Sequence, residues 1–239
     1  MRQPSQASDG STIRLNSALP PADAYVFDID GTLLNSRDLV HWNAFHRAIA
    51  EAYGSTATLE GVQCHGMTDV LILRAALARA GVRDGEFQAK LPRALKVLRR
   101  EVDHNREGLK PEVCVGIKPL LRRLQDSGHL LGVASGNLAS VGWHKITAAG
   151  LRDFFSFGSF SDECESRTEI FRNAIAMAEA QSGSATRVCF VGDTPFDIQA
   201  ARDVGAPVVA VATGIFGIEE LKAGAPDVCV AHCEDLLQS

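Results

Sequence analysis

The sequence lacks the features that direct a protein to nucleic acid or into a membrane. It has no long run of Lys or Arg, and its formal net charge is −5, so it offers no basic surface for nucleic acid or anionic lipid. No stretch approaches the roughly 18 consecutive apolar residues of a membrane span. The polar segment 1–17 also lacks the apolar centre of a signal peptide. We therefore expect a cytoplasmic protein that binds neither nucleic acid nor membrane.

The cysteine pattern excludes a disulfide framework. The six cysteines are scattered and form no C-x-x-C pair, which in a cytoplasmic chain of this size indicates free thiols. Cys229, His232 and Cys233 are close enough in sequence to suggest a metal site, but no second cluster of ligands accompanies them. We interpret these three residues as structural. Nothing in the sequence indicates the oligomeric state.

What the sequence does contain is an alternation of apolar runs and helical patterns. Runs that predict buried strands cover residues 24–27, 130–134, 187–191 and 207–211, with shorter candidates at 154–158 and 227–230. Helical spacing of apolar residues covers 118–127, 138–149, 168–181 and 197–204. Strands that alternate with helices pair in parallel through right-handed crossovers. The prediction is an α/β fold with a Rossmann-like parallel sheet and helices on both faces.

One block interrupts this alternation. Residues 39–53, 70–80 and 87–104 have helical spacing, and the block around them lacks strand signals. We predict an α-helical cap domain over residues 36–111, inserted after the first strand. The catalytic core would comprise residues 23–35 and 112–239. Residues 1–22 are predicted to form a flexible tail, with residues 12–15 as the one candidate strand in it.

Three predicted strands end in small polar clusters, at residues 28–32 (DIDGT), 135–137 (SGN) and 192–194 (GDT). Ligands bind outside the carboxyl ends of strands in an open parallel sheet, so we expect the clusters to converge. Asp28 and Asp30 project to the same side of an extended chain, and Gly31 permits the tight turn that follows. Two such carboxylates repel each other unless a cation separates them. With Asp193 as a third carboxylate, the ligand set is of the kind that Mg²⁺ prefers.

The paired carboxylates also suit phosphoryl transfer. One can attack phosphorus to give an aspartyl-phosphate, and its neighbour can protonate the leaving oxygen and then activate water. A metal ion would neutralise charge on the transferring group. The alternative interpretation of residues 28–32 is an ordinary turn, since Asp, Gly and Thr are common in turns. The two further polar clusters make the turn the weaker interpretation.

These segments resemble the motifs of the haloacid dehalogenase superfamily. Residues 25–34 (YVFDIDGTLL) resemble its first motif, residues 133–137 (VASGN) its second and residues 191–197 (VGDTPFD) its fourth. With the inserted helical block, the resemblance spans about residues 23–235. It implies a Mg²⁺-dependent phosphatase, similar to the phosphoglycolate phosphatase-like subgroup, that acts on a small phosphorylated metabolite.

The resemblance also implies roles for individual residues. Asp28 would be the nucleophile and Asp30 the acid/base catalyst. Mg²⁺ would be bound by the Asp28 side chain, the Asp30 backbone carbonyl and Asp193, with Asp197 in support one helical turn away. The expected phosphate-binding residues, at a helix start, are Thr32, Ser135, Gly136 and Asn137. In the helical block Gly66 and Thr68 are candidates for substrate contact, and one of His41, His46, His65 and His104 could line the pocket.

The chain departs from this family at its third motif. The family places there a Lys that pairs with the nucleophile and the phosphate, but no Lys lies between Ile146 and the fourth motif. Two residues could supply the missing cation. Arg167 lies nearer the usual position, at a predicted helix start, and its fork suits phosphate. Lys145 has the usual side chain but lies about two turns into its helix.

Other functions remain open on the sequence alone. A phosphomutase of the same fold would keep both Asp28 and Asp30. A non-catalytic phosphate-sensing or protein-binding module would account for the missing Lys. A dehalogenase needs the nucleophile but neither the metal nor Asp30, so the presence of Asp30 argues against it.

Overall fold

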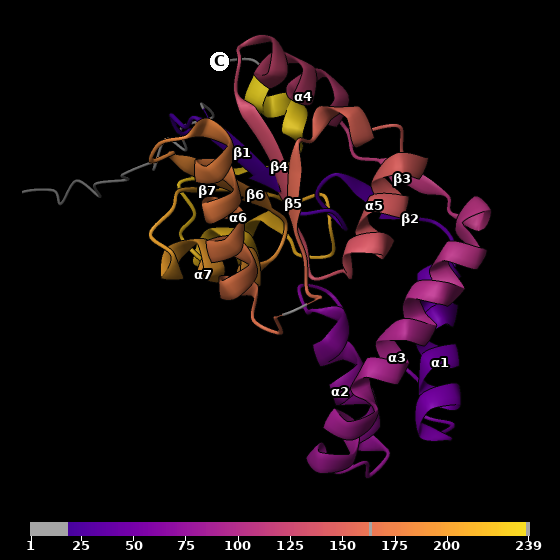
Figure 1. Ribbon diagram of the computed structural model, residues 1–239. Coiled ribbons are helices and arrows are strands. Elements are labelled where there is room, and N and C mark those ends of the chain that lie inside the picture. Colours follow the sequence, from indigo (N-terminus) through magenta and orange to yellow (C-terminus); the bar gives the residue numbers. More distant parts are fainter. Residues whose placement is uncertain (1–18, 163, 238–239) are drawn as a thin grey trace, which may run out of the picture.

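The structure, a computed structural model, describes residues 19–162 and 164–237. A sheet between layers of helices forms one part of the molecule, and a group of three helices projects from it (Figure 1). Most of the predicted tail, including the candidate strand at 12–15, falls outside the described residues. The described part of the predicted tail packs on the core, because Ala22 is buried there and the Pro20 carbonyl accepts a hydrogen bond from the Tyr25 hydroxyl.

The sheet contains six strands, all parallel, in the order β5-β4-β1-β6-β7-β8. The strands are β1 (Ala24–Phe27), β4 (Leu130–Ala134), β5 (Phe157–Ser159), β6 (Val188–Gly192), β7 (Val208–Val211) and β8 (Val228–Val230). They are short, apolar and mostly buried, as parallel strands covered on both faces are. Because the chain winds outward from β1 to both edges, the carboxyl ends of β1, β4 and β6 meet at the switch point where open α/β sheets bind ligands.

Helices cover both faces of this sheet. Tyr25 and Phe27 point to the face packed by α4 (Ile117–Asp126) and α5 (Ala139–Ala148). The intervening residues of β1 point to the other face, since side chains alternate along a strand. That face is covered by α6 (Arg167–Ser182), α7 (Pro195–Asp203) and α8 (Ile218–Ala223). The arrangement confirms the predicted α/β fold with helices on both faces of a parallel sheet.

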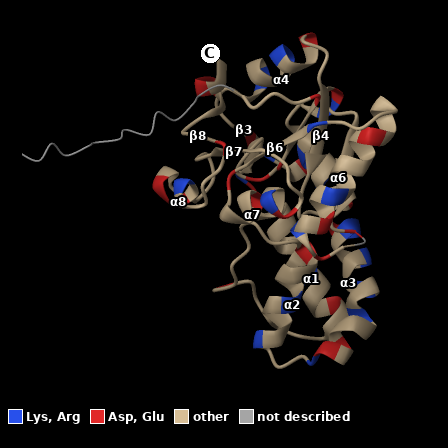
Figure 2. Ribbon diagram, turned by 90° about the vertical axis from the view of Figure 1, so that its left-hand side faces the viewer, with Lys and Arg blue, Asp and Glu red and all other residues tan. Residues whose placement is uncertain are grey.

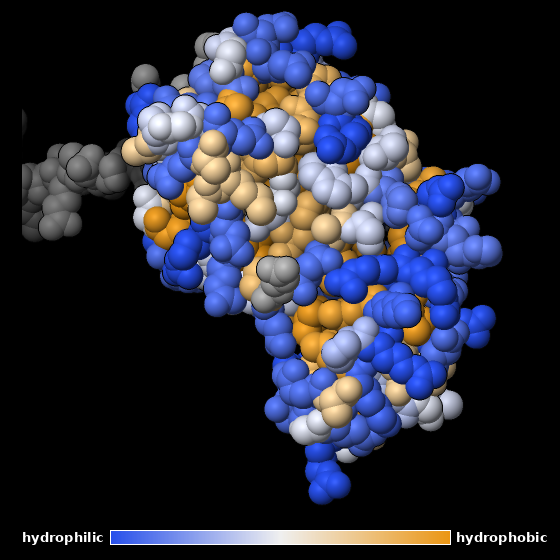
Figure 3. Space-filling model, in the orientation of Figure 1, coloured by the Kyte–Doolittle hydropathy of each residue, from blue (hydrophilic) through white to orange (hydrophobic). Residues whose placement is uncertain are grey.

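The projecting group consists of α1 (Val40–Tyr53), α2 (Asp69–Arg79) and α3 (Asp84–His104). Its helices confirm the helical spacing of this part of the sequence, although α3 begins three residues before the predicted start. They share an apolar core that also includes Leu138 and Val141, so the group packs against the start of α5. Hydrophilic side chains cover most of its outer surface in Figure 3, and apolar surface shows where it meets the rest of the molecule.

Two strands at the ends of the helical block were not expected. β2 (Leu34–Ser36) and β3 (Pro111–Val113) form an antiparallel pair, so the two connections to the helical group run side by side. Three-residue strands are too short to show an apolar alternation, and Pro111 argues against a strand in sequence. The short helix α8 and the 3-10 helices Arg106–Gly108, Arg152–Phe154 and Cys233–Leu237 were missed for the same reason of length.

Charged side chains are dispersed over the molecule. Figure 2 shows Lys and Arg positions interspersed with Asp and Glu positions along the helices of both parts. Among the described residues, no helix combines the length and apolar character needed to cross a membrane.

Candidate active site

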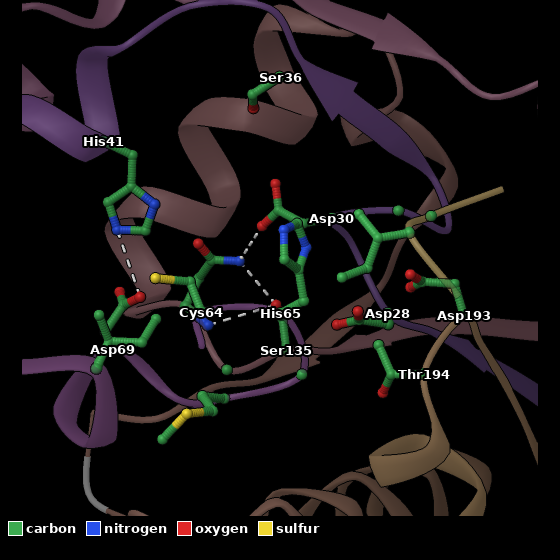
Figure 4. A pocket seen from close by; sticks show the side chains of 18 of the residues that line it. Asp28, Asp30, Ser36, His41, Cys64, His65, Asp69, Ser135, Asp193 and Thr194 are labelled. Atoms are coloured by element: carbon green, nitrogen blue, oxygen red, sulfur yellow. Dashed lines mark hydrogen bonds and ion pairs between the residues drawn. The ribbon is translucent and has the colours of Figure 1, made fainter. Parts of the chain in front are cut away.

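One cavity of about 320 Å³ lies at the carboxyl edge of the sheet, between the sheet and the helical group. Loops that follow β1, β4 and β6 form its floor, and Figure 4 shows Asp28, Asp193 and Ser135 directed toward it from those three loops. The structure thus brings together the three polar clusters that lie far apart in sequence. The predicted site residues that line the cavity are Asp28, Asp30, Gly66, Ser135, Gly136, Asn137, Lys145, Arg167 and Asp193.

The loop after β1 packs directly on Asp193. Gly31 has φ +87°, and a Cβ atom at this position would overlap the Asp193 carboxylate, so glycine is required for the close approach. Thr32 is buried and donates a hydrogen bond from Oγ1 to Asp193 Oδ1 at 2.9 Å. Thr32, predicted to bind phosphate, is not in the cavity lining. Its hydroxyl instead orients the Asp193 carboxylate.

Three buried carboxylates, those of Asp28, Asp193 and Asp197, each place an oxygen within 4.8 Å of the others. Burial raises the pKa of Asp28, and Arg167 offsets this only in part. Burial and the carboxylate of Asp28 likewise raise the pKa of Asp193. Crowded, desolvated carboxylates of this kind are stabilised by a divalent cation, so the oxygen-rich cluster fits a metal ion.

Asp197 differs from the other two carboxylates because its oxygens are already engaged. Its Oδ2 accepts hydrogen bonds from the backbone N–H and the hydroxyl of Thr194, which closes a capping box at the start of α7. Its Oδ1 accepts from Arg167 Nε at 2.7 Å. Asp197 therefore lies outside the cavity lining, where it binds Arg167 and Thr194, and Asp28 and Asp193 are the two carboxylates of the cluster that face the cavity.

Arg167, the first residue of α6, lies between two of these carboxylates. Its Nη2 lies 2.8 Å from Asp28 Oδ1, and its Nε lies 2.7 Å from Asp197 Oδ1. The carboxylates of Asp197 and Asp28 raise its pKa in spite of burial, so the guanidinium stays charged. Within the described residues Nη2 makes no well-directed hydrogen bond, although it is buried. An acceptor entering the cavity would satisfy it.

Lys145 reaches a different carboxylate. Its Nζ lies 2.8 and 2.7 Å from the two oxygens of Asp30 and 3.0 Å from Asn137 Oδ1. Asn137 Nδ2 also donates to Asp30 at 2.7 Å. Desolvation opposes the charge on Asp30, but Lys145 and the hydrogen bond from Asn137 outweigh it and lower its pKa. The two candidate cations therefore serve two carboxylates, Arg167 that of Asp28 and Lys145 that of Asp30.

The loop after β4 supplies hydrogen-bond donors. Ser135 Oγ accepts from Asn137 Nδ2 at 2.8 Å, which orients the hydroxyl and leaves its proton available to an acceptor in the cavity. Gly136 lies so close to the helical group that a Cβ atom there would overlap the Met67 carbonyl. The Gly136 carbonyl also accepts from Asp69 N–H at 2.8 Å. The donor loop and the helical group are thus in direct contact.

Some of the remaining predicted residues line the cavity and others do not. Thr68 is buried outside the cavity lining, where it caps α2 through Leu71 N–H and donates to the Glu165 carbonyl. Gly66 lines the cavity, and its carbonyl accepts a hydrogen bond from Arg167. Of the four histidines considered, His41 and His65 line the cavity. Sequence reasoning missed one set of lining residues, all from the helical group: Trp42, Phe45, Leu59, Met67 and Ile72.

Comparisons with known proteins agree on one family. A family model described as haloacid dehalogenase-like hydrolase matches residues 25–211. The chain is 30% identical over 217 residues to a phosphoglycolate phosphatase of Synechococcus elongatus (90% of this chain, 96% of the relative) and 27% identical to one of Mesorhizobium japonicum (88% and 91%). Its fold is similar to CbbY of Rhodobacter sphaeroides, crystallised with phosphate, with a TM-score of 0.65 at 17% identity (90% and 96% covered).

The carboxylate cluster predicts how an Asp193→Asn substitution changes thermal stability. Since the pKa of Asp193 is raised above the roughly 3.9 of an unfolded chain, its ionisation opposes folding as pH rises. In metal-free buffer the variant should therefore melt above the parent, by a margin that grows between about pH 5 and pH 8. Millimolar Mg²⁺ should raise the melting temperature of the parent by about 5 °C and that of the variant little.

Differential scanning fluorimetry with and without chelator checks this, with Asp126→Asn, an exposed residue at the end of α4, as the control. An Asp193→Asn protein that Mg²⁺ stabilises as strongly as the parent would show that the cluster is not the metal site.

Proposed function

The chain belongs to the haloacid dehalogenase-like hydrolase family, and we propose that it is a Mg²⁺-dependent phosphatase that hydrolyses a small phosphorylated metabolite through an aspartyl-phosphate on Asp28. One observation carries the proposal. A buried carboxylate, Asp28, faces a cavity in which Asp193, an under-satisfied Arg167 and the Ser135 hydroxyl converge. A nucleophile, a metal ligand and two phosphate-oxygen donors are the parts that phosphoryl transfer requires.

In the first step an Asp28 oxygen attacks phosphorus and the bond from phosphorus to the ester oxygen breaks. Arg167 stabilises the charge on the phosphoryl oxygens and offsets part of the rise in the pKa of Asp28 that burial causes. The Ser135 hydroxyl donates to a second phosphoryl oxygen. The leaving oxygen takes a proton from Asp30, two residues along the same loop, which must first take that proton up from solvent because Lys145 and Asn137 lower its pKa.

In the second step Asp30 acts as a base. It removes a proton from the water that attacks phosphorus, which releases inorganic phosphate and restores the Asp28 carboxylate. Lys145 and Asn137 support this role because they hold both Asp30 oxygens at the cavity. We assign Lys145 as a positioning residue, since it acts on the substrate only through Asp30.

Mg²⁺ would be held by the carboxylates of Asp28 and Asp193 and by the Asp30 backbone carbonyl, and when bound it supplies positive charge opposite the phosphoryl oxygens. The buried carboxylate cluster supports this assignment. Residues 36–111 act as the cap of this site. The contacts of Gly66 and Asp69 with Arg167 and Gly136 support that role, because they seat the helical group over the catalytic loops.

The test of the function is metal-dependent turnover. Purified protein should release inorganic phosphate from p-nitrophenyl phosphate with Mg²⁺ and stop when the metal is chelated. The Asp28→Asn variant preserves the side-chain shape but removes the nucleophile, so it should have no measurable turnover while melting as a folded protein. A chain that binds phosphate without turnover would be a sensing module, and one that only isomerises a sugar phosphate would be a phosphomutase.

Arg167 gives a second, quantitative prediction. An Arg167→Met substitution removes one preorganised charge, worth about 2–4 kcal/mol in the transition state, so kcat/KM should fall roughly 10²–10³-fold. The matched control is Arg172→Met, an exposed arginine on the same helix, which should stay within about twofold. Steady-state kinetics with thermal melts for both variants decide the matter. An equal, small effect in the two variants would remove Arg167 from the site.

A further inference from the structure

The cavity has two chemically different walls. The catalytic wall is formed by the charged and polar side chains described above. The opposite wall comes from the helical group, where Trp42, Phe45, Leu59, Met67 and Ile72 form its apolar part and Asp38, His41, His65 and Asp69 are its titratable side chains. Figure 4 shows the polar pair of His41 and Asp69 on the side of the pocket away from Asp28 and Asp193. Whatever is esterified to the phosphate must lie against this wall, so its side chains determine the leaving group.

The apolar wall offers no Lys or Arg to an anionic leaving group. Among the described residues that line the cavity, the side chains of this kind are Lys145 and Arg167, and the imidazoles of His41 and His65 line it as well. Lys145 is already paired with Asp30, and Arg167 with Asp28. A carboxylate on the leaving group would therefore be desolvated without a permanently charged partner of its own, which is unfavourable.

The acidic residues of this wall do not select a cationic leaving group either. Asp38 accepts hydrogen bonds from the backbone N–H groups of Val40 and Lys110. Asp69 accepts from Leu138 N–H at 2.8 Å and lies 3.4 Å from His41 Nε2. Both carboxylates thus already accept hydrogen bonds from backbone N–H groups of the protein. Neither has an oxygen set aside for a ligand ammonium.

Apolar surface is left exposed at the cavity. Trp42 is 40% exposed and Ile215, from the loop after β7, is 61% exposed, and both line the cavity. Beside them His41 is stacked on Phe45 with ring centroids 4.7 Å apart. Exposed aromatic and aliphatic surface of this kind is stabilised when a ligand covers it. The cavity volume is at the lower end of the roughly 300–1,000 Å³ of small-molecule sites, so the ligand is small.

We propose that the substrate is a small phosphate monoester whose leaving group is uncharged and apolar or aromatic, and that Trp42 is a residue that determines this specificity. The inference rests on the proposed phosphatase activity. It separates this chain from its relatives named phosphoglycolate phosphatase, because phosphoglycolate carries a carboxylate on the leaving group.

Three esters of primary alcohols, whose leaving groups differ in charge and in apolar character, test the proposal in the presence of Mg²⁺. They are benzyl phosphate (uncharged), 2-phosphoglycolate (anionic) and O-phosphoethanolamine (cationic). We expect kcat/KM for benzyl phosphate to exceed that for each charged ester by roughly tenfold or more. A charged ester that equals or exceeds benzyl phosphate overturns the proposal while leaving the phosphatase function intact. No turnover of these esters or of p-nitrophenyl phosphate overturns the function itself.

A charge introduced at the apolar wall provides the matched variant. Trp42→Arg should raise the ratio of kcat/KM for 2-phosphoglycolate to that for benzyl phosphate by roughly tenfold or more, since it gives the carboxylate a partner. Met177→Arg is the control, because Met177 is also 40% exposed but lies on α6 outside the cavity lining. An unchanged ratio in a Trp42→Arg protein that melts like the parent would show that this wall does not contact the leaving group.

Discussion

The site depends on placing several carboxylates together at one edge of a buried sheet. Asp28, Asp193 and Asp197 each place a carboxylate oxygen within 4.8 Å of the others, and burial together with neighbouring negative charge raises the pKa of Asp28 and of Asp193. Arg167, at the start of α6, neutralises part of this negative charge. One Asp197 oxygen accepts a hydrogen bond from Thr194 N–H in the capping box at the start of α7. The charge that remains faces the cavity. The arrangement that would bind a metal ion therefore also leaves the proposed nucleophile, Asp28, facing the cavity.

Two buried cations occupy the site where the family usually has one lysine at its third motif, and each of them contacts a different carboxylate. Arg167 contacts the proposed nucleophile, and Lys145 contacts the proposed acid/base carboxylate. An arginine fork can contact Asp28 and Asp197 at once from a fixed plane, which a lysine ammonium does less well. The substitution at the third motif is thus compatible with a working site, and it does not require the non-catalytic alternative.

Much of the fold and the floor of the site followed from local sequence patterns. Buried parallel strands have unbroken runs of apolar residues in the sequence. The runs of β1, β4 and β6 each end at a polar cluster, so the convergence of Asp28, Ser135 and Asp193 could be predicted. The cation could not be assigned, because the reach of Lys145 to Asp30 depends on how α5 folds back over the sheet. The hydroxyls of Thr32 and Thr68 were predicted to bind a ligand, but the Thr32 hydroxyl donates to Asp193, and the Thr68 hydroxyl caps α2 and donates to the Glu165 carbonyl. Which face of α1 meets the cavity depends on the packing of Leu138 and Val141.

The central claim is that Asp28 becomes covalently phosphorylated during turnover. Protein quenched in acid during steady hydrolysis, then reduced with borohydride and digested, can be mapped by peptide mass spectrometry, since borohydride converts an aspartyl-phosphate into homoserine. The account predicts homoserine at position 28, present only when substrate and Mg²⁺ are both supplied and absent from the unreacted protein. Turnover with an unmodified Asp28, or with the modification at another carboxylate, would contradict it.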